Sequence, residues 1–175
     1  QIEAASPRIV ESPSYAVSLI LSGLFKRMVL ASLLFTRGVT ETFYSPENYS
    51  SAGLWIAMIG YSIQIYCDFS GYTDLIRGFG LFFGFKIPES FRGPYAATSV
   101  GEFWRRWHIT FGSWLRDFIY FPLGGSRRHP IRVYLNLLIT MLLCGIWHGA
   151  SWGFVIWGTI HGVALVLHKA WLDLS

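Results

Sequence analysis

A long stretch without charged residues limits the fold of this chain more than any other feature. Between Arg132 and Lys169 there are 36 residues with no Asp, Glu, Lys or Arg. One straight helix of that length would measure about 54 Å, whereas the hydrocarbon core of a membrane is about 30 Å thick. A cluster of glycines at 145–153 lies where a break is needed. The stretch therefore predicts two membrane helices, at about 132–148 and 152–170.

The composition also indicates a membrane protein. Hydrophobic residues make up 53% of the 175 residues and charged residues only 14%, and the mean hydropathy is +0.42. Soluble domains carry about 25% charged residues, because their surface faces water. The net charge of +4 does not favour nucleic acid binding, since the basic residues are few and interleaved with apolar runs. Basic residues beside apolar spans are typical of cytoplasmic loops and of contacts with lipid headgroups.

The ends of the sequence are typical of an internal part of a longer protein. The chain begins with Gln1 rather than Met, without a signal pattern, and stops shortly after its last apolar run. We expect a single partial membrane domain over residues 1–175, with further spans before and after it. Cys67 and Cys144 both lie in apolar stretches, which does not favour a disulfide.

Two further membrane spans are predicted in the first part of the chain. Residues 14–35 form an apolar helix pattern in which Lys26 and Arg27 either snorkel or face a protein interior. Residues 48–67 are uncharged and follow a Ser-Pro pair, which is a helix-start signal.

The middle of the chain predicts helices of other kinds. Asp68 and Asp74 flank a short turn and are expected to cap the next helix, or alternatively to hold a tunnel-lining loop. Residues 75–87 are too short to span a membrane and predict a re-entrant or buried segment. Residues 101–121 alternate basic and aromatic side chains, as an interfacial helix does. The predicted fold class is therefore all-α, a polytopic transmembrane protein with re-entrant and interfacial helices.

Two histidines are candidate functional residues. His148 lies among tryptophans inside the uncharged stretch, where an ionisable side chain indicates function. Burial there favours the neutral imidazole, which can accept a proton. A core histidine with satisfied hydrogen bonds is the alternative. His108 follows the basic and aromatic residues 104–107, and in a continuous helix it would share a face with Trp104. Such a helix suits a phosphate-bearing donor, although lipid headgroups explain its arginines equally well.

Other interpretations of the polar residues stay open. His129, His161 and His168 are explained by headgroup or solvent contact, by a helix-packing hydrogen bond and by snorkelling, respectively. Cys144 and His148 are four residues apart, so a nucleophilic Cys-His pair is an alternative to a buried apolar cysteine. His148 and His161 are alternative haem ligands. No His-x-x-x-His or Cys-x-x-Cys pair supports a local metal site.

Three motifs, in order along the chain, resemble those of the membrane-bound O-acyltransferases. They are Cys67-Asp68-Phe69-Ser70-Gly71-Tyr72-Thr73-Asp74; Glu102-Phe103-Trp104-Arg105-Arg106-Trp107-His108-Ile109 with Trp114-Leu115-Arg116-Asp117; and Trp147-His148-Gly149-Ala150-Ser151-Trp152. The match runs over about residues 15–170. Within the superfamily it is most similar to the bacterial branch of alginate O-acetyltransferases and teichoic acid D-alanyl transferases.

The resemblance implies roles for particular residues. His148 stands at the position of the family's catalytic histidine, and His108 at that of the second histidine of the bacterial branch. The substrate-binding residues predicted on this basis are Trp104, Arg105, Arg106, Trp107, Arg116, Asp68, Ser70 and Trp147. We expect neutral His148 to take the proton of an acceptor hydroxyl while its oxygen attacks a thioester, with His108 orienting or assisting.

The resemblance also implies the setting of the reaction. The acyl donor is expected to be acetyl-CoA or a carrier-bound thioester, with acetyl as the favoured acyl group and with no metal and no tightly bound cofactor. The expected partners are membrane lipids, an extracytoplasmic protein that accepts or relays the acyl group, and a polysaccharide acceptor, at a bacterial inner membrane crossed several times. The alternative is a fragment of a transporter or channel, which would move a solute without modifying it.

Overall fold

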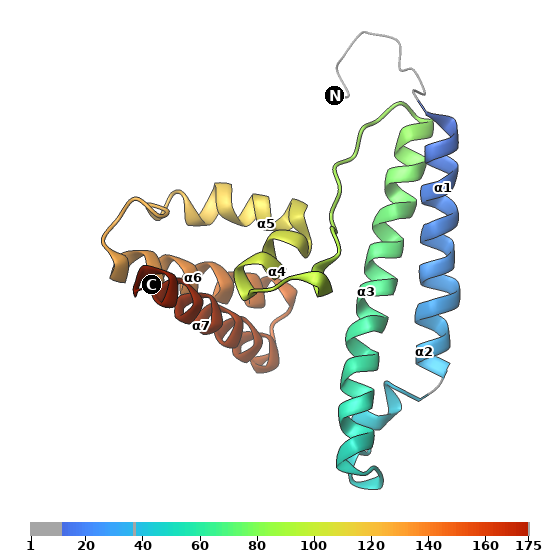
Figure 1. The fold of residues 1–175 in the computed structure, drawn as a ribbon, viewed down its shortest axis with the longest axis horizontal. Helices are drawn as coiled ribbons and strands as arrows, with labels where there is room; N and C mark the ends of the chain where they lie inside the picture. Colours follow the sequence, from blue (N-terminus) through green and yellow to red (C-terminus); the bar gives the residue numbers. More distant parts are fainter. Residues whose placement is uncertain (1–11, 37, 175) are drawn as a thin grey trace. The chain divides into compact units, whose positions relative to one another are not determined.

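The computed structural model describes residues 12–36 and 38–174 (Figure 1), and no strand occurs among these residues. The all-α fold class predicted from the sequence is confirmed. The chain divides into two compact units, an N-terminal unit that ends at Glu89 and a C-terminal unit that begins at Ser90. The single partial membrane domain expected over residues 1–175 stays a prediction.

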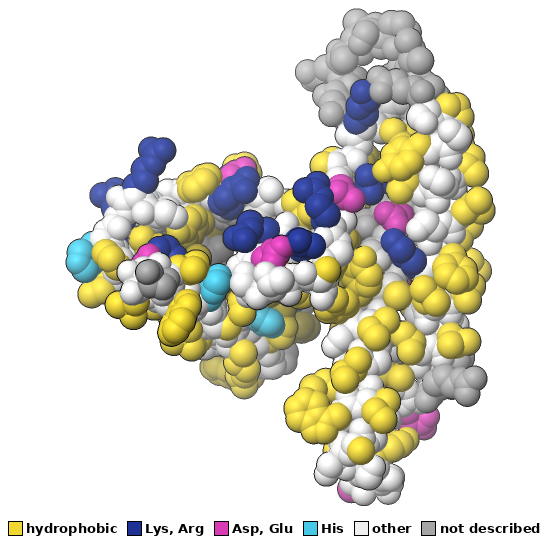
Figure 2. Space-filling model, viewed as in Figure 1, with side chains coloured by type: hydrophobic (Ala, Val, Ile, Leu, Met, Phe, Trp, Pro, Cys, Tyr) yellow, Lys and Arg dark blue, Asp and Glu magenta, His cyan; other side chains and the backbone are white. Residues whose placement is uncertain are grey.

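The N-terminal unit is a hairpin of two long helical segments. Its elements are α1 (Pro13–Leu24), the π-helix η1 (Phe25–Ala31), α2 (Ser32–Thr36), the short 3-10 helices η2 (Glu41–Phe43) and η3 (Pro46–Asn48), and α3 (Ser51–Phe82). Ser50 caps α3, because its hydroxyl accepts the backbone N–H of Gly53 at 3.2 Å. α1 and α3 lie side by side in Figure 1, with apolar side chains along much of the hairpin surface (Figure 2).

The length of α3 corrects two predictions. The segment 75–87 was expected to be a short re-entrant or buried segment of its own, but α3 continues through Asp68 and Asp74 as far as Phe82. Those two carboxylates therefore lie inside a helix and do not cap the next one. Asp68 pairs with Arg27 and Asp74 with Lys26, two cations of η1 that lie 41 and 48 residues earlier in the sequence.

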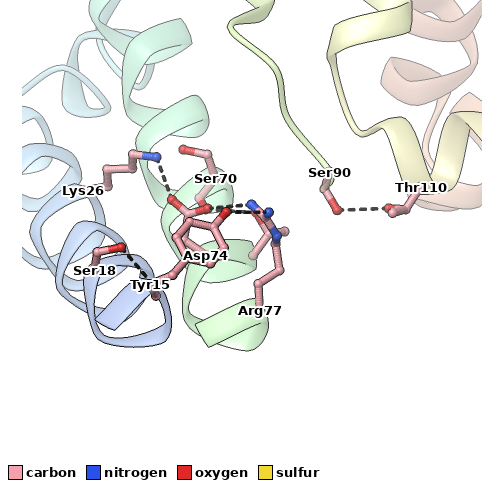
Figure 3. Close-up of polar contacts among 9 residues, drawn as sticks. Tyr15, Ser18, Lys26, Ser70, Asp74, Arg77, Ser90 and Thr110 are labelled. Carbon is pink, nitrogen blue, oxygen red and sulfur yellow. Dashed lines mark hydrogen bonds and ion pairs between the residues drawn. The ribbon is translucent and has the colours of Figure 1, made fainter. Parts of the chain in front are cut away.

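An ion-pair cluster joins η1 to α3. Lys26 Nζ lies 2.7 Å from Asp74 Oδ2, and Arg77 Nη1 lies 3.6 Å from Asp74 Oδ1 (Figure 3). Arg77 also donates to the hydroxyl of Tyr15 at 3.2 Å. The Asp74 and Arg77 side chains are only 13% and 15% exposed, so Lys26 pairs with a carboxylate inside the hairpin. Of its two predicted orientations, snorkelling or facing a protein interior, Lys26 has the second. The pair Arg27–Asp68, at 3.2 Å, is about half exposed.

Three of the described helical segments are long and apolar enough to cross a membrane. They are Pro13–Phe35, Pro130–His148 and Trp152–Leu174. The predicted span over 48–67 lies in α3 from Ser51 onward, and α3 is not one of the three. Although this part of α3 is uncharged, it carries polar groups such as Tyr61 and Gln64 that lower its hydropathy.

The C-terminal unit contains the candidate histidines. Its elements are η4 (Pro94–Ala96), α4 (Val100–Arg106), α5 (Ile109–Leu115), the π-helix η5 (Arg116–Tyr120), α6 (Pro130–His148) and α7 (Trp152–Leu174). The two helices predicted at 132–148 and 152–170 are confirmed, with the break between them at residues 149–151.

The single helix predicted over 101–121 is wrong, because the chain breaks at Trp107 and His108. Trp107 is extended and His108 has a left-handed φ of 43°. The extended segment 90–92 supplies backbone partners for the break: Arg92 N–H donates to Arg106 O at 3.0 Å and Ile109 N–H to Ser90 O at 2.8 Å. The hydroxyls of Ser90 and Thr110 add a hydrogen bond of 3.1 Å (Figure 3). Trp104 and His108 thus belong to different helical segments and share no helix face.

α6 and α7 approach each other closely through two glycines. A Cβ at Gly145 would overlap the carbonyl oxygen of Phe154, and one at Gly158 would lie 2.5 Å from the carbonyl oxygen of Met141. Only glycine allows this approach, which brings residues of both helices around His148.

Gly158→Ala is therefore expected to destabilise the full-length protein by about 1–3 kcal/mol relative to Gly153→Ala. Both substitutions add a methyl group to α7 and raise helix propensity equally. At Gly153, however, the nearest atom to the new Cβ is the Ser151 hydroxyl at 3.6 Å, an ordinary contact. Thermal unfolding of the purified proteins measures the difference, and equal midpoints for the two variants would contradict the close packing.

Candidate active site

The break between α4 and α5 determines where His108 lies. Histidine adopts the left-handed region more readily than most residues do. The His108 ring stacks on Phe91, with centroids 6.2 Å apart and planes at 15°, and its centroid is 5.2 Å from that of Phe111. Its Nδ1 lies 3.4 Å from the Thr110 hydroxyl. These contacts hold the imidazole in one orientation.

His148 is the last residue of α6 and is surrounded by aromatic rings. Trp147 and Trp157 meet its ring nearly edge-on, with centroids 5.1 and 5.2 Å away, and Phe154 stacks on it at 5.9 Å. Since α6 ends here and α7 begins a few residues later, rings from both helices reach the imidazole.

Phe111 connects the two candidate catalytic histidines. Its ring centroid is 5.2 Å from that of His108, 6.5 Å from that of His148 and 4.3 Å from that of Trp147. Residues that are 40 positions apart in the sequence therefore lie in one aromatic cluster. Trp147 is 59% exposed and His148 is exposed as well, whereas Phe111 and His108 are part-buried. Exclusion of water around His148 therefore stays a prediction.

The protonation of His108 follows from this environment. Burial lowers the pKa of His108, and the neighbouring His148 lowers it further, because two charged imidazoles repel each other. His108 is therefore neutral at neutral pH and its ring can accept a hydrogen bond.

The lowered pKa of His108 makes the free energy of unfolding depend on pH. The unfolded chain binds a proton on this residue near pH 6.5, whereas the folded chain does so only at lower pH. Stability from this residue is fully present above about pH 6.5 and is lost as the pH falls through the folded pKa. His108→Asn removes the titration and keeps a residue that tolerates the left-handed backbone. We expect its unfolding midpoint to fall less than that of the wild type between pH 7.5 and pH 5; parallel falls would contradict the assignment.

A cavity of about 470 Å³ lies beside His108 in the C-terminal unit. Five of the predicted site residues line it: Trp104, Arg105, Trp107, His108 and Arg116. α6 contributes the apolar side chains of Leu137, Met141 and Cys144 to the wall of the cavity. The cavity thus offers guanidinium groups to an anion and an apolar wall to a hydrocarbon chain.

Three predicted residues of the C-terminal unit do not line this cavity. Trp147 and His148 lie at the end of α6, with His148 one helical turn beyond the lining residue Cys144. Arg106 is bound to the Glu102 carboxylate. Hydrogen bonds from the Thr98 backbone and hydroxyl, and from Arg106, lower the pKa of Glu102 to about 2. These contacts give Arg106 a structural role at the end of α4.

The other two predicted substrate-binding residues belong to the N-terminal unit. Asp68 forms the ion pair with Arg27 on the hairpin surface. Ser70 is 1% exposed, and its hydroxyl has no hydrogen-bond partner among the described residues. Binding of substrate by Asp68 and Ser70 stays a prediction.

Sequence reasoning missed His161 and Trp157 as members of the aromatic cluster. The His161 ring meets Trp104 edge-on at 5.0 Å and lies 4.7 Å from Trp157, which in turn contacts His148. The expected helix-packing hydrogen bond of His161 is absent from the described part of the chain. The spacing of Trp157 and His161, one helical turn on α7, was the available signal for a shared face.

The alternative chemistries find no further support in the described residues. Cys144 is 2% exposed and is packed in the wall of the cavity, as an apolar core cysteine is. Within residues 12–36 and 38–174 no group of three His, Cys, Asp or Glu side chains is placed to hold a metal ion.

Apolar helices long enough to cross a membrane, and a cavity beside clustered histidines, define the chain as part of an integral membrane protein of the helical class. The family model of the MBOAT, membrane-bound O-acyltransferase family, matches residues 3–175. The chain belongs to the membrane-bound O-acyltransferase family.

Curated relatives agree with this family. The peptidoglycan O-acetyltransferase of Helicobacter pylori is 44% identical over 149 residues, which cover 85% of this chain and 28% of that protein. The probable alginate O-acetylase AlgI of Pseudomonas putida is 41% identical over 86% of this chain and 30% of its own length. The teichoic acid D-alanyltransferase of Streptococcus thermophilus is 28% identical over 90% of this chain and 40% of its own length. The chain thus spans 28–40% of the length of these relatives.

Proposed function

We propose that the full-length protein is an O-acyltransferase that moves an acetyl group from a thioester donor to a hydroxyl of a cell-envelope polysaccharide, directly or through a relay protein. The observation that carries the proposal is the aromatic cluster that joins His108 and His148 beside a cavity with arginines and an apolar wall. The names of the relatives favour acetyl, because the O-acetyl transferring proteins are 41–44% identical and the D-alanyl transferring one 28%.

The donor is assigned to the cavity. Arg105 and Arg116 line it, and guanidinium groups bind phosphate groups such as those of a nucleotide or carrier thioester. Leu137, Met141 and Cys144 offer an apolar wall to the arm that bears the thioester. Acetyl-CoA and a carrier-bound thioester both fit this description.

His148 is assigned the role of general base. Its imidazole takes the proton of the acceptor hydroxyl as the oxygen attacks the thioester carbonyl. When the tetrahedral intermediate collapses, the carbon–sulfur bond breaks and the proton passes from the imidazolium to the departing sulfur. His108, on the other side of Phe111, orients the reacting groups or assists with the proton. The aromatic rings keep water away from the thioester.

Transfer of a labelled acetyl group tests the proposal. Cells that carry or lack the full-length gene are supplied with labelled acetyl donor, and label is measured in polysaccharide outside the cytoplasm. We expect labelled polysaccharide only in cells that carry the gene. The protein that transfers the label is expected to cross the inner membrane several times. A solute that crosses the membrane without covalent attachment would instead indicate a transporter. Labelled D-alanine in place of acetyl would change the acyl group and keep the family chemistry.

A further inference from the structure

The loop between η5 and α6 presents basic side chains from a fixed backbone. Asn136, 1% exposed in α6, donates its side-chain N–H to the carbonyl oxygen of Gly125 at 3.2 Å. The hydroxyls of Tyr120 and Ser126 add a hydrogen bond of 2.9 Å across the same turn. Two interactions therefore tie this loop to the neighbouring helices.

The side chain of Arg128 packs against the backbone of Gly124. Gly124 has φ +110°, and a Cβ built there would lie 2.8 Å from Arg128 Nε and 2.9 Å from its Cγ. The absence of a side chain at Gly124 thus determines where the guanidinium stem of Arg128 lies.

Arg128 shares a hollow with a second arginine. The hollow, of about 500 Å³, is lined by Pro122, Leu123, Arg128, His129 and Arg132. No carboxylate lines it, and neither arginine has an ion-pair partner among the described residues. Arg128 and Arg132 are both exposed, and an anion between them gains attraction from two positive charges. Their planar forks match the oxygens of a phosphate group.

The position of the hollow indicates the source of the phosphate. α6 begins at Pro130 and is one of the three segments apolar enough to cross a membrane. Arg128, His129 and Arg132 therefore lie at the end of a span, where basic residues meet lipid headgroups. We propose that Arg128 and Arg132 form a binding site for the phosphate group of an anionic phospholipid, separate from the cavity beside His108.

The test uses the purified full-length protein and a fluorescent phosphatidylglycerol in detergent micelles. For Arg128→Gln with Arg132→Gln we expect affinity to fall about 100-fold, since each charge-assisted hydrogen bond from a guanidinium to a phosphate contributes about tenfold. Arg127→Gln is the control, because it removes one charge from the same loop but does not line the hollow. Its affinity should fall no more than about fivefold, the contribution of one basic residue near an anionic lipid. Gly124→Ala, which leaves the charge unchanged, should also weaken binding by displacing Arg128.

The outcomes separate a built site from a diffuse charge effect. Equal losses in the control and the double variant, or wild-type affinity in the double variant, would overturn the proposal. Inorganic phosphate, added as a competitor, identifies the source of the bound phosphate group. If millimolar phosphate does not displace the fluorescent lipid, the ligand is a phospholipid. If phosphate displaces the lipid from the wild-type protein but not from the variants, the site binds a soluble phosphate. A fluorescent diacylglycerol without phosphate should bind all variants equally. None of these readouts depends on acyl transfer.

Discussion

Replacement of His148 by alanine in the full-length protein is expected to lower acyl transfer by about 10²–10⁴-fold, the usual contribution of a general base. The imidazole lies at the end of α6, where the rings of Trp147, Phe154 and Trp157 contact it. Without it, the acceptor hydroxyl must lose its proton to water, which is a much weaker base than imidazole. The rate of labelled acetyl transfer, divided by the amount of folded protein, is the quantity to measure.

Two controls separate catalysis from packing at this site. His148→Phe keeps an aromatic ring against Phe154 and Trp157, so a loss of activity with unchanged thermal stability isolates the proton transfer. Cys144→Ser tests the alternative nucleophile one helical turn earlier in α6 and should keep most of the activity. A His148→Ala protein that transfers acetyl at more than half the wild-type rate would return His148 to a packing role. Inactive Cys144→Ser at normal abundance would favour the Cys-His pair.

The parts of the fold that sequence patterns predict well are those set by neighbouring residues. The charge-free stretch before Lys169 gave α6 and α7, because hydropathy and a glycine-rich break are local properties. The break at His108 was missed because its hydrogen-bond partners lie in the extended segment 90–92. α3 was cut short because Asp74 looked like a cap, whereas its partner Lys26 is 48 residues away.

The candidate site divides in the same way. His108 and His148 were identified from their surrounding motifs, and their proximity through Phe111 depends on the break that the pattern did not predict. For His161 the i,i+4 spacing to Trp157 on α7 was available, but the contact with Trp104 joins it to α4, a separate segment. Ring contacts between separate segments have no sequence spacing by which they could be found.

Asp74→Asn is expected to destabilise the protein by about 3–5 kcal/mol, the range for removing one partner of a buried ion pair. The Asp74 carboxylate lies between two cations, with Lys26 Nζ at 2.7 Å and Arg77 Nη1 at 3.6 Å, and its side chain is 13% exposed. Asparagine keeps the shape of the side chain but leaves two positive charges inside the hairpin without a negative one. The unfolding midpoint of the full-length protein in detergent reports the loss.

Asp68→Asn is the matched comparison on the same helix. Asp68 also pairs with a cation of η1, but the side chains of Asp68 and Arg27 are 56% and 46% exposed. Water already screens this pair, so its removal should cost about 0–1 kcal/mol. Removing both charges of the buried pair, with Lys26→Met and Asp74→Leu, should restore part of the stability lost in Asp74→Asn, because no lysine is then left unpaired. Equal losses for Asp68→Asn and Asp74→Asn would mean that burial does not distinguish the two pairs and that the hairpin is held by its apolar contacts alone.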